Sequence, residues 1–357
     1  MSGTWGRNIK FSIFGESHGK AVGITIDGLK PGIEVDLDYI KREMVRRAPG
    51  KSELSTQRQE DDSFEILSGL FMGKTTGTPL CAIIRNSGQH SKDYEKTKSL
   101  IRPSHADYTG SVKYMGFNDY RGGGHFSGRL TAPLVFAGAV CRQVLEKRGI
   151  IIGSHVRSIG RIEDRGFSLK DIDQDKLQSL RSEGFPVLDA EAGEAMQKAI
   201  LDARAEQDSV GGVIETAAIN LPAGIGDPFF DSLESTLAHL LFSVPGIKGL
   251  EFGAGFDITR LRGSEANDEY YVDDGKVSAY SNNNGGIIGG ITNGMPLLFR
   301  VAVKPTPSIG RTQRTINIEN MNNETIEISG RHDPCIVTRA VPVIEAVTAM
   351  ALLDNIE

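Results

Sequence analysis

The residues best suited to chemistry in this chain form the segment Arg121-Gly-Gly-Gly-His-Phe-Ser-Gly-Arg129. Its three consecutive glycines carry no side chains, so a ligand can approach the peptide N–H groups directly. An imidazole, a hydroxyl and two guanidinium groups lie beside these glycines, and such a set suits a phosphorylated ligand. Residues 130–149 have a helical pattern, and a helix N-terminus favours anions. The segment therefore predicts a functional site.

Three other segments place a histidine among small polar residues. They are Gly15-Glu-Ser-His-Gly19, Arg102-Pro-Ser-His-Ala-Asp107 and Gly330-Arg-His-Asp-Pro-Cys335. A single histidine is more often a structural hydrogen-bonding group than a catalyst, but four in similar settings, His125 included, favour catalysis. No His or Cys pair has the short spacing of a tetrahedral zinc site, so we expect no metal.

Two further motifs each allow two interpretations. Lys304-Pro-Thr-Pro-Ser308 follows a strand-like run, and it is either a phosphate clasp or a rigid turn that ends the strand. Asp208-Ser-Val-Gly-Gly212 follows a helical run, and it is either a stop for that helix or a ligand contact. Local chemistry does not separate these alternatives.

Composition excludes several classes of protein. A formal net charge of −6 argues against a nucleic-acid-binding protein, because such proteins carry an excess of positive charge. The arginines gathered in the unusual segments instead fit a small anionic substrate. Three cysteines without a CxxC pair indicate reduced thiols. The N-terminus lacks a signal-peptide h-region, and the longest apolar run, 132–141, is too short to span a bilayer. We expect a cytoplasmic protein that binds neither nucleic acid nor membrane.

The order of predicted elements favours an α+β fold in a single domain, because strict βαβ alternation is absent. Strands are expected at 11–14, 22–26, 65–70, 78–84, 213–221, 285–292 and 297–303. Helices are expected from a cap at Asp36, at 130–149, at 190–206, from a cap at Asp231 or Ser232, and from Pro342. Asn293-Gly294 predicts a hairpin turn before 297–303, and 52–62 predicts a mobile loop.

Taken together, these segments resemble chorismate synthase, the last enzyme of the shikimate pathway. The resemblance extends over nearly the whole chain and keeps the family's order. Its motifs are GESHG at 15–19, RRAPG at 46–50, TQR at 56–58, RPSHAD at 102–107, RGGGHFSGR at 121–129, DSVGG at 208–212, KG at 248–249, NNNGGIIGGITNG at 282–294, KPTPS at 304–308 and GRHDPC at 330–335. It implies a helix layer between antiparallel β-sheets and a homotetramer.

The resemblance also implies a reaction. In this family 5-enolpyruvylshikimate 3-phosphate loses phosphate and a ring proton in an anti 1,4-elimination that gives chorismate. Reduced FMN is required, and its usual rationale is transient electron donation that weakens the allylic C–O bond. Some members reduce their flavin with NADPH; this chain carries no separate nicotinamide motif, so an external reductant is the default.

Roles for individual residues follow from the resemblance. His18 resembles the acid that protonates the departing phosphate, and His105 the residue that protonates or stabilises reduced flavin; both roles need a group that titrates near neutrality. Asp333, with Ser17 and Ser127, resembles a relay that helps the flavin take the ring proton. The implied substrate contacts are Arg47, Arg102, Arg121, Arg129 and Arg331. The implied FMN contacts are His125, Phe126, Ser127, Pro245, Gly246, Gly289, Lys304, Pro305, Thr306, Pro307, Ser308 and Arg331.

The chain departs from the family pattern at two places. Ala48 stands where many members have a third arginine, and His125-Phe126 stands where many have Arg-Ser. A rival hypothesis is a non-catalytic binder of phosphorylated metabolites, which would need the arginines and glycines but not the histidines.

Overall fold

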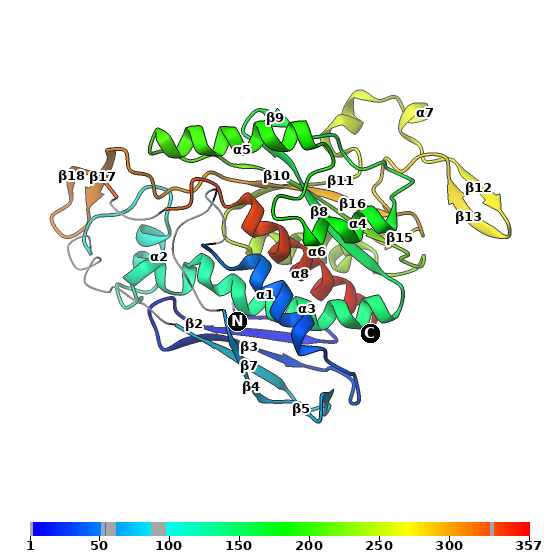
Figure 1. The fold of residues 1–357 in the computed structure, drawn as a ribbon, viewed down its shortest axis with the longest axis horizontal. Helices are drawn as coiled ribbons and strands as arrows, with labels where there is room; N and C mark the ends of the chain where they lie inside the picture. Colours follow the sequence, from blue (N-terminus) through cyan, green and yellow to red (C-terminus); the bar gives the residue numbers. More distant parts are fainter. Residues whose placement is uncertain (1–2, 51–53, 55–61, 87–97, 329–331) are drawn as a thin grey trace.

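Two five-stranded antiparallel sheets enclose a layer of helices (Figure 1). The computed structural model describes residues 3–50, 54, 62–86, 98–328 and 332–357. The first sheet has the order β1 (Thr4–Trp5), β2 (Lys10–Gly15), β3 (Ala21–Asp27), β7 (Leu80–Arg85) and β4 (Phe64–Ser68). The second has the order β11 (Ile247–Phe252), β16 (Leu297–Val303), β10 (Gly212–Ile219), β8 (Ile151–Ile159) and β9 (Ile162–Glu163).

The helices between the sheets are α1 (Leu37–Arg47), α3 (Thr131–Lys147), α6 (Leu233–Ser243) and α8 (Val337–Ile356). Outside this layer are α2 (Asp107–Lys113), α4 (Gln174–Ser179), α5 (Ala190–Ala205) and α7 (Gly263–Ala266). Two-stranded ribbons complete the fold: β5 (Leu70–Phe71) with β6 (Lys74–Thr75), β12 (Tyr270–Asp273) with β13 (Lys276–Ala279), β14 (Ile287–Ile288) with β15 (Ile291–Thr292), and β17 (Gln313–Asn317) with β18 (Asn322–Ile326). The predicted α+β architecture with a helix layer between antiparallel sheets is confirmed.

Every second residue of β3 and β7 in the first sheet is apolar and buried, and this face packs on the helices. Val22, Ile24 and Ile26 alternate along β3 and are buried, and the apolar residues of β7 continue the same face. In the helix layer, Gly138 of α3 packs directly on Ala346 of α8. A Cβ atom at Gly138 would lie 2.3 Å from the Ala346 Cα atom, so glycine lets the two backbones touch.

Helix caps lie where the sequence predicted them. The Asp36 carboxylate accepts hydrogen bonds from the backbone N–H groups of Asp38 and Tyr39 at 2.8 and 3.1 Å. For α6 the cap is Ser232, whose hydroxyl accepts from the Ser235 N–H at 3.1 Å. Each cap satisfies a backbone donor that the first helical turn leaves unpaired.

Two local predictions were wrong. Helix α8 begins at Val337, so Pro342 lies inside it, because burial of the residues around the proline outweighs the loss of one backbone hydrogen bond. Asn293-Gly294 does not join a hairpin, since β15 pairs with β14 while β16 pairs with β10 and β11. Asn293 is not among the residues with positive φ, which a type I′ turn would require of it.

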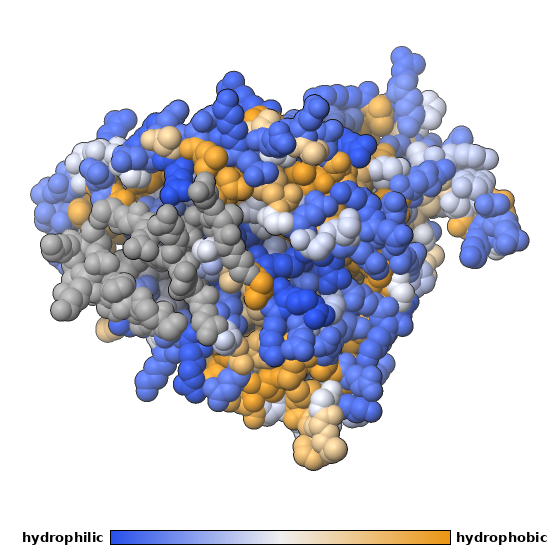
Figure 2. All heavy atoms as spheres, viewed as in Figure 1, coloured by the Kyte–Doolittle hydropathy of each residue, from blue (hydrophilic) through white to orange (hydrophobic). Residues whose placement is uncertain are grey.

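The face in Figure 2 is mostly hydrophilic, and apolar residues gather at its lower edge over β4 and β5. Leu67, Phe71 and Met72 are exposed there. None of the helices in the described part of the chain is both long enough and apolar enough to cross a membrane.

Candidate active site

The triple-glycine segment forms a tight loop that leads into α3. Gly122, Gly123 and Gly124 have φ angles of 59°, 88° and 52°, a conformation that other residues adopt at a cost. A Cβ atom at Gly122 would lie 2.1 Å from Cε1 of His18. The bare backbone therefore both shapes the loop and allows the His18 ring to lie against it.

The loop and the Gly15–Gly19 segment form one unit. The Ser17 N–H donates to the carbonyl of Gly124 at 3.1 Å, and the Ser17 hydroxyl lies 3.3 Å from the Gly122 carbonyl oxygen. The same hydroxyl lies 3.2 Å from Nδ1 of His18. His125 Nδ1 lies 2.8 Å from the Gly15 carbonyl oxygen. These contacts orient the His18 ring beside the glycines.

A second group of predicted residues gathers around His105. Its Nε2 atom lies 2.9 Å from the Ser308 hydroxyl, and its Nδ1 atom lies 3.0 Å from the Pro103 carbonyl oxygen. The Lys304 ammonium donates to the Ser104 carbonyl at 2.8 Å, while the Lys304 N–H donates to the Gly246 carbonyl at 2.9 Å. The structure thus unites Lys304–Ser308, the His105 segment and Pro245-Gly246.

Arg102 links the two groups. A Cβ atom at Gly123 would lie 3.9 Å from an Arg102 guanidinium nitrogen and 3.9 Å from the Ser127 Cβ atom, so Arg102 reaches the glycine loop. Burial, together with the positive charge of Arg102, lowers the pKa of His105 to about 4. This differs from the expectation that His105 titrates near neutrality, and the cause is that its surroundings disfavour the imidazolium.

Each of the four described arginines predicted to bind substrate pairs with a carboxylate. Arg102 binds Asp107 through two guanidinium nitrogens, both at 2.8 Å, and Arg121 binds Asp119 in the same way. Sequence reasoning missed these carboxylates, although their short separations from the arginines were a usable signal.

Arg47 and Arg129 share the carboxylate of Asp62. Arg47 donates to one oxygen at 3.0 Å, and Arg129 donates to the other. All three side chains are buried, whereas Arg121 is 38% exposed. Arg121 is therefore the most accessible of the four described arginines to a ligand from solvent.

Asp333, the predicted relay residue, pairs with Arg339 of α8, and Arg339 also donates to the Arg47 carbonyl at 3.2 Å. The Ser127 hydroxyl accepts from the Arg129 N–H at 3.2 Å and so caps the turn before α3. Asp333 is thereby tied to the Arg47 segment, and Ser127 to the glycine loop.

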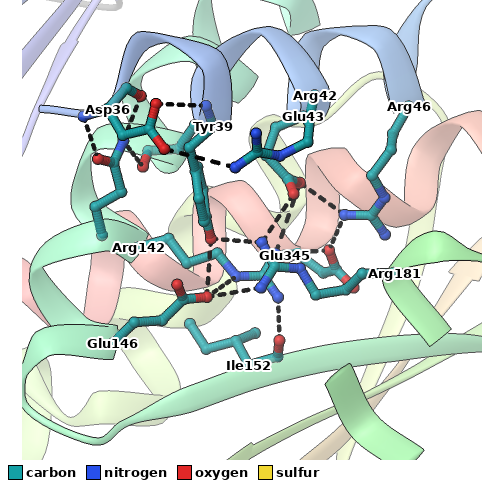
Figure 3. Close-up of polar contacts among 12 residues, drawn as sticks. Asp36, Tyr39, Arg42, Glu43, Arg46, Arg142, Glu146, Ile152, Arg181 and Glu345 are labelled. Atoms are coloured by element: carbon teal, nitrogen blue, oxygen red, sulfur yellow. Dashed lines mark hydrogen bonds and ion pairs between the residues drawn. The ribbon is translucent and has the colours of Figure 1, made fainter. Parts of the chain in front are cut away.

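A cluster of buried and half-buried charges lies in the helix layer next to Arg47 (Figure 3). This helix-layer cluster consists of Glu43, Arg46, Arg142, Glu146, Arg181 and Glu345. Burial opposes ionisation of Glu43, but the surrounding guanidinium groups outweigh it and lower its pKa to about 2. The cluster joins α1 to α3 and α8 immediately before Arg47.

Known proteins resemble this chain over almost its whole length. The family profile of chorismate synthase matches residues 9–356. The chain is 48% identical to chorismate synthases of Dehalococcoides mccartyi, over 99% of this chain and 96% of the relative, and of Pyrococcus abyssi, over 98% and 96%. The chain belongs to the chorismate synthase family. A crystal structure of a chorismate synthase superimposes with a TM-score of 0.76 at 31% identity, covering 98% of this chain and 92% of that one.

Two of the residues that the chorismate synthase resemblance points to are not placed with the rest. Arg331 lies outside the described residues. Gly289 belongs to the β14–β15 turn, whose Gly290 carbonyl accepts from the Leu233 N–H at the start of α6. Pro245-Gly246 follows the other end of this helix, whose 11 residues span roughly 16 Å. Within one chain, Gly289 is therefore remote from the other predicted flavin contacts.

Among the residues that the structure describes, no group of three or more His, Cys, Asp and Glu side chains is arranged to hold a metal ion.

Proposed function

We propose that this chain catalyses the anti 1,4-elimination of phosphate from 5-enolpyruvylshikimate 3-phosphate to give chorismate. The observation that carries the proposal is the meeting of His18, Arg102 and the triple-glycine loop, with His105 three residues beyond Arg102. Phosphate and carboxylate groups need guanidinium partners, and the departing phosphate needs an acid. Both kinds of group lie together here.

Reduced FMN is the cofactor that the family resemblance implies, and the residues present fit it. The Thr306 hydroxyl oxygen is buried and has no hydrogen-bond partner within the described part of the chain. It lies beside Lys304 in a loop with two prolines, so an unsatisfied donor and a cation are available for a phosphate. The bare glycine backbone and the exposed ring of Phe126 provide surface for a planar group.

We assign the flavin to Lys304–Ser308, His125–Ser127 and Pro245-Gly246, with Arg331 added on the resemblance alone. Gly289, which the resemblance also implies, is left out of this assignment because it is remote from these residues within one chain. When bound, reduced FMN supplies the electron density that weakens the C–O bond to phosphate. His105, neutral near pH 7 because of its lowered pKa, holds Ser308 by a hydrogen bond. An anion bound beside it would raise this pKa toward neutrality.

The chain's own groups then account for binding and proton transfer. Arg121 can exchange Asp119 for an anionic group of the substrate, since both form bidentate contacts with a guanidinium. Ser17 orients His18, which gives its proton to the departing phosphate. Asp333, Ser17 and Ser127 are proposed to relay the ring proton.

We further propose that residues 1–357 form one catalytic domain and that the protein is a cytoplasmic homotetramer whose flavin is reduced externally. The exposed apolar residues over β4 and β5 support association, because such patches commonly mark protein contacts.

Substitution of His18 separates this lyase from a mere metabolite binder. His18→Ala should lower turnover by about 100-fold or more while substrate still binds. His239→Ala is the matched control, because His239 is exposed and packs on Trp5. Turnover by rapid quench and substrate affinity by calorimetry are measured on both. Equal turnover in His18→Ala and the control would overturn the acid role of His18.

A further inference from the structure

The turn 206–211 joins α5 to β10, and it contacts two separate parts of the candidate site. The Ser209 hydroxyl donates to the carbonyl of Thr306 at 2.7 Å. The next residue, Val210, donates its N–H to the carbonyl of Pro334 at 2.9 Å. Adjacent residues of one turn thus hold the Lys304–Ser308 loop and the residue after Asp333.

The same turn also fixes both ends of that loop. At its far end, the Gly310 N–H donates to the Gln207 carbonyl at 3.0 Å, and Arg311 pairs with Glu206 and Asp208 at 2.8 and 3.1 Å. At its near end, a Cβ atom at Gly211 would lie 2.4 Å from the Val303 carbonyl oxygen. Only glycine allows this approach.

The composition of the loop explains why it needs an external support. Pro305 and Pro307 have no N–H groups, so the loop has few donors with which to stabilise itself. The carbonyl of Thr306, between the two prolines, is the point at which Ser209 holds the loop. Movement there would shift Lys304 away from the Ser104 carbonyl and Ser308 away from His105.

We propose that Ser209 is a positioning residue for the flavin-binding loop. Its hydroxyl sets the place of Thr306 and, through it, the reach of Lys304 and Ser308. The DSVGG motif, which follows the end of α5, thereby supports the loop that binds the ligand. This inference rests on the proposed flavin site.

Three variants of the full chain test the role. Ser209→Ala removes the donor, and Ser209→Thr keeps it. Ser68→Ala is the matched control, because the Ser68 hydroxyl likewise donates to a distant backbone carbonyl, that of Pro79 at 2.8 Å, in the first sheet. For each variant, the dissociation constant of FMN is measured by fluorescence titration, and amide hydrogen exchange is measured over residues 303–311.

Loss of one net hydrogen bond predicts that Ser209→Ala weakens FMN binding by about 2- to 12-fold and speeds exchange in the loop. Ser209→Thr and Ser68→Ala should bind FMN as the unaltered chain does. Unchanged FMN affinity and exchange in Ser209→Ala would overturn the role, as would equal losses in Ser68→Ala. If the unaltered chain binds no FMN, the proposed function fails, and the exchange data alone still decide whether Ser209 holds the loop.

Discussion

Neutralising Glu345 is expected to destabilise the protein strongly. Glu345 lies on α8 with no solvent exposure, and one of its oxygens accepts from Arg46 at 2.6 Å and from Arg142 at 2.8 Å (Figure 3). Its other oxygen has no hydrogen-bond partner within the described residues. Glu345→Gln keeps the volume of the side chain and removes only its charge.

The expected cost follows from charge balance in the helix-layer cluster. Its glutamates and arginines are equal in number, so removal of one negative charge leaves a buried guanidinium uncompensated. Breaking a buried pair in this way costs about 3–5 kcal/mol. Domains are typically stable by only about 5–15 kcal/mol, so the loss would be a large part of the total.

Urea unfolding at pH 7, followed by circular dichroism, measures this cost. Asp257→Asn is the matched control, because Asp257 pairs with Arg260 at the surface with 68% and 82% exposure. A surface pair contributes about 0–1 kcal/mol, so the control should change stability little. If Glu345→Gln costs no more than the control, the reasoning about buried charge is refuted.

Three other outcomes are expected. Because the pKa of Glu43 is lowered to about 2, the stabilisation that its carboxylate provides is present above its unfolded pKa of about 4.3 and is lost as pH falls toward 2. In thermal melts from pH 7 to 3, the melting temperature should therefore decline less in Glu43→Gln than in the unaltered chain. Burial opposes a charged His155, but the hydrogen bonds of this imidazole to two carboxylates outweigh burial and raise its pKa. The stabilisation from the imidazolium is therefore present below pH about 6.5 and is lost as pH rises through the folded pKa. Thermal melts of His155→Gln should not show this loss. Gly122→Ala should lower turnover by about 10- to 100-fold by displacing His18, whereas Gly32→Ala, also at positive φ but with open space for a Cβ, should not; equal rates in steady-state assays would contradict the assigned contact.

Local signals in the sequence were sufficient for most elements. Asp36 and Ser232 cap helices because their side chains satisfy backbone donors within a few residues, and such effects are visible in a short window. The start of the last helix was wrongly predicted at Pro342 because the cause of its earlier start is not local. This helix persists through burial against distant elements, which no local window contains.

The motifs predicted which segments meet but not how their charges pair. The link of Arg47 and Arg129 through Asp62 joins three separate segments, so only the fold shows it. The low pKa of His105 likewise depends on burial and on Arg102. Ser209 was noticed within its motif, yet its role required the position of Thr306, 97 residues further along the chain.

The most direct test of the central claim is an anaerobic assay of the purified chain with reduced FMN and 5-enolpyruvylshikimate 3-phosphate. Released phosphate and the absorbance of chorismate are followed together. We expect both products to form at equal rates, and neither to form when reduced FMN is omitted. No phosphate release, under conditions in which the Pyrococcus abyssi relative turns over, would contradict the assignment of this chain as an active lyase.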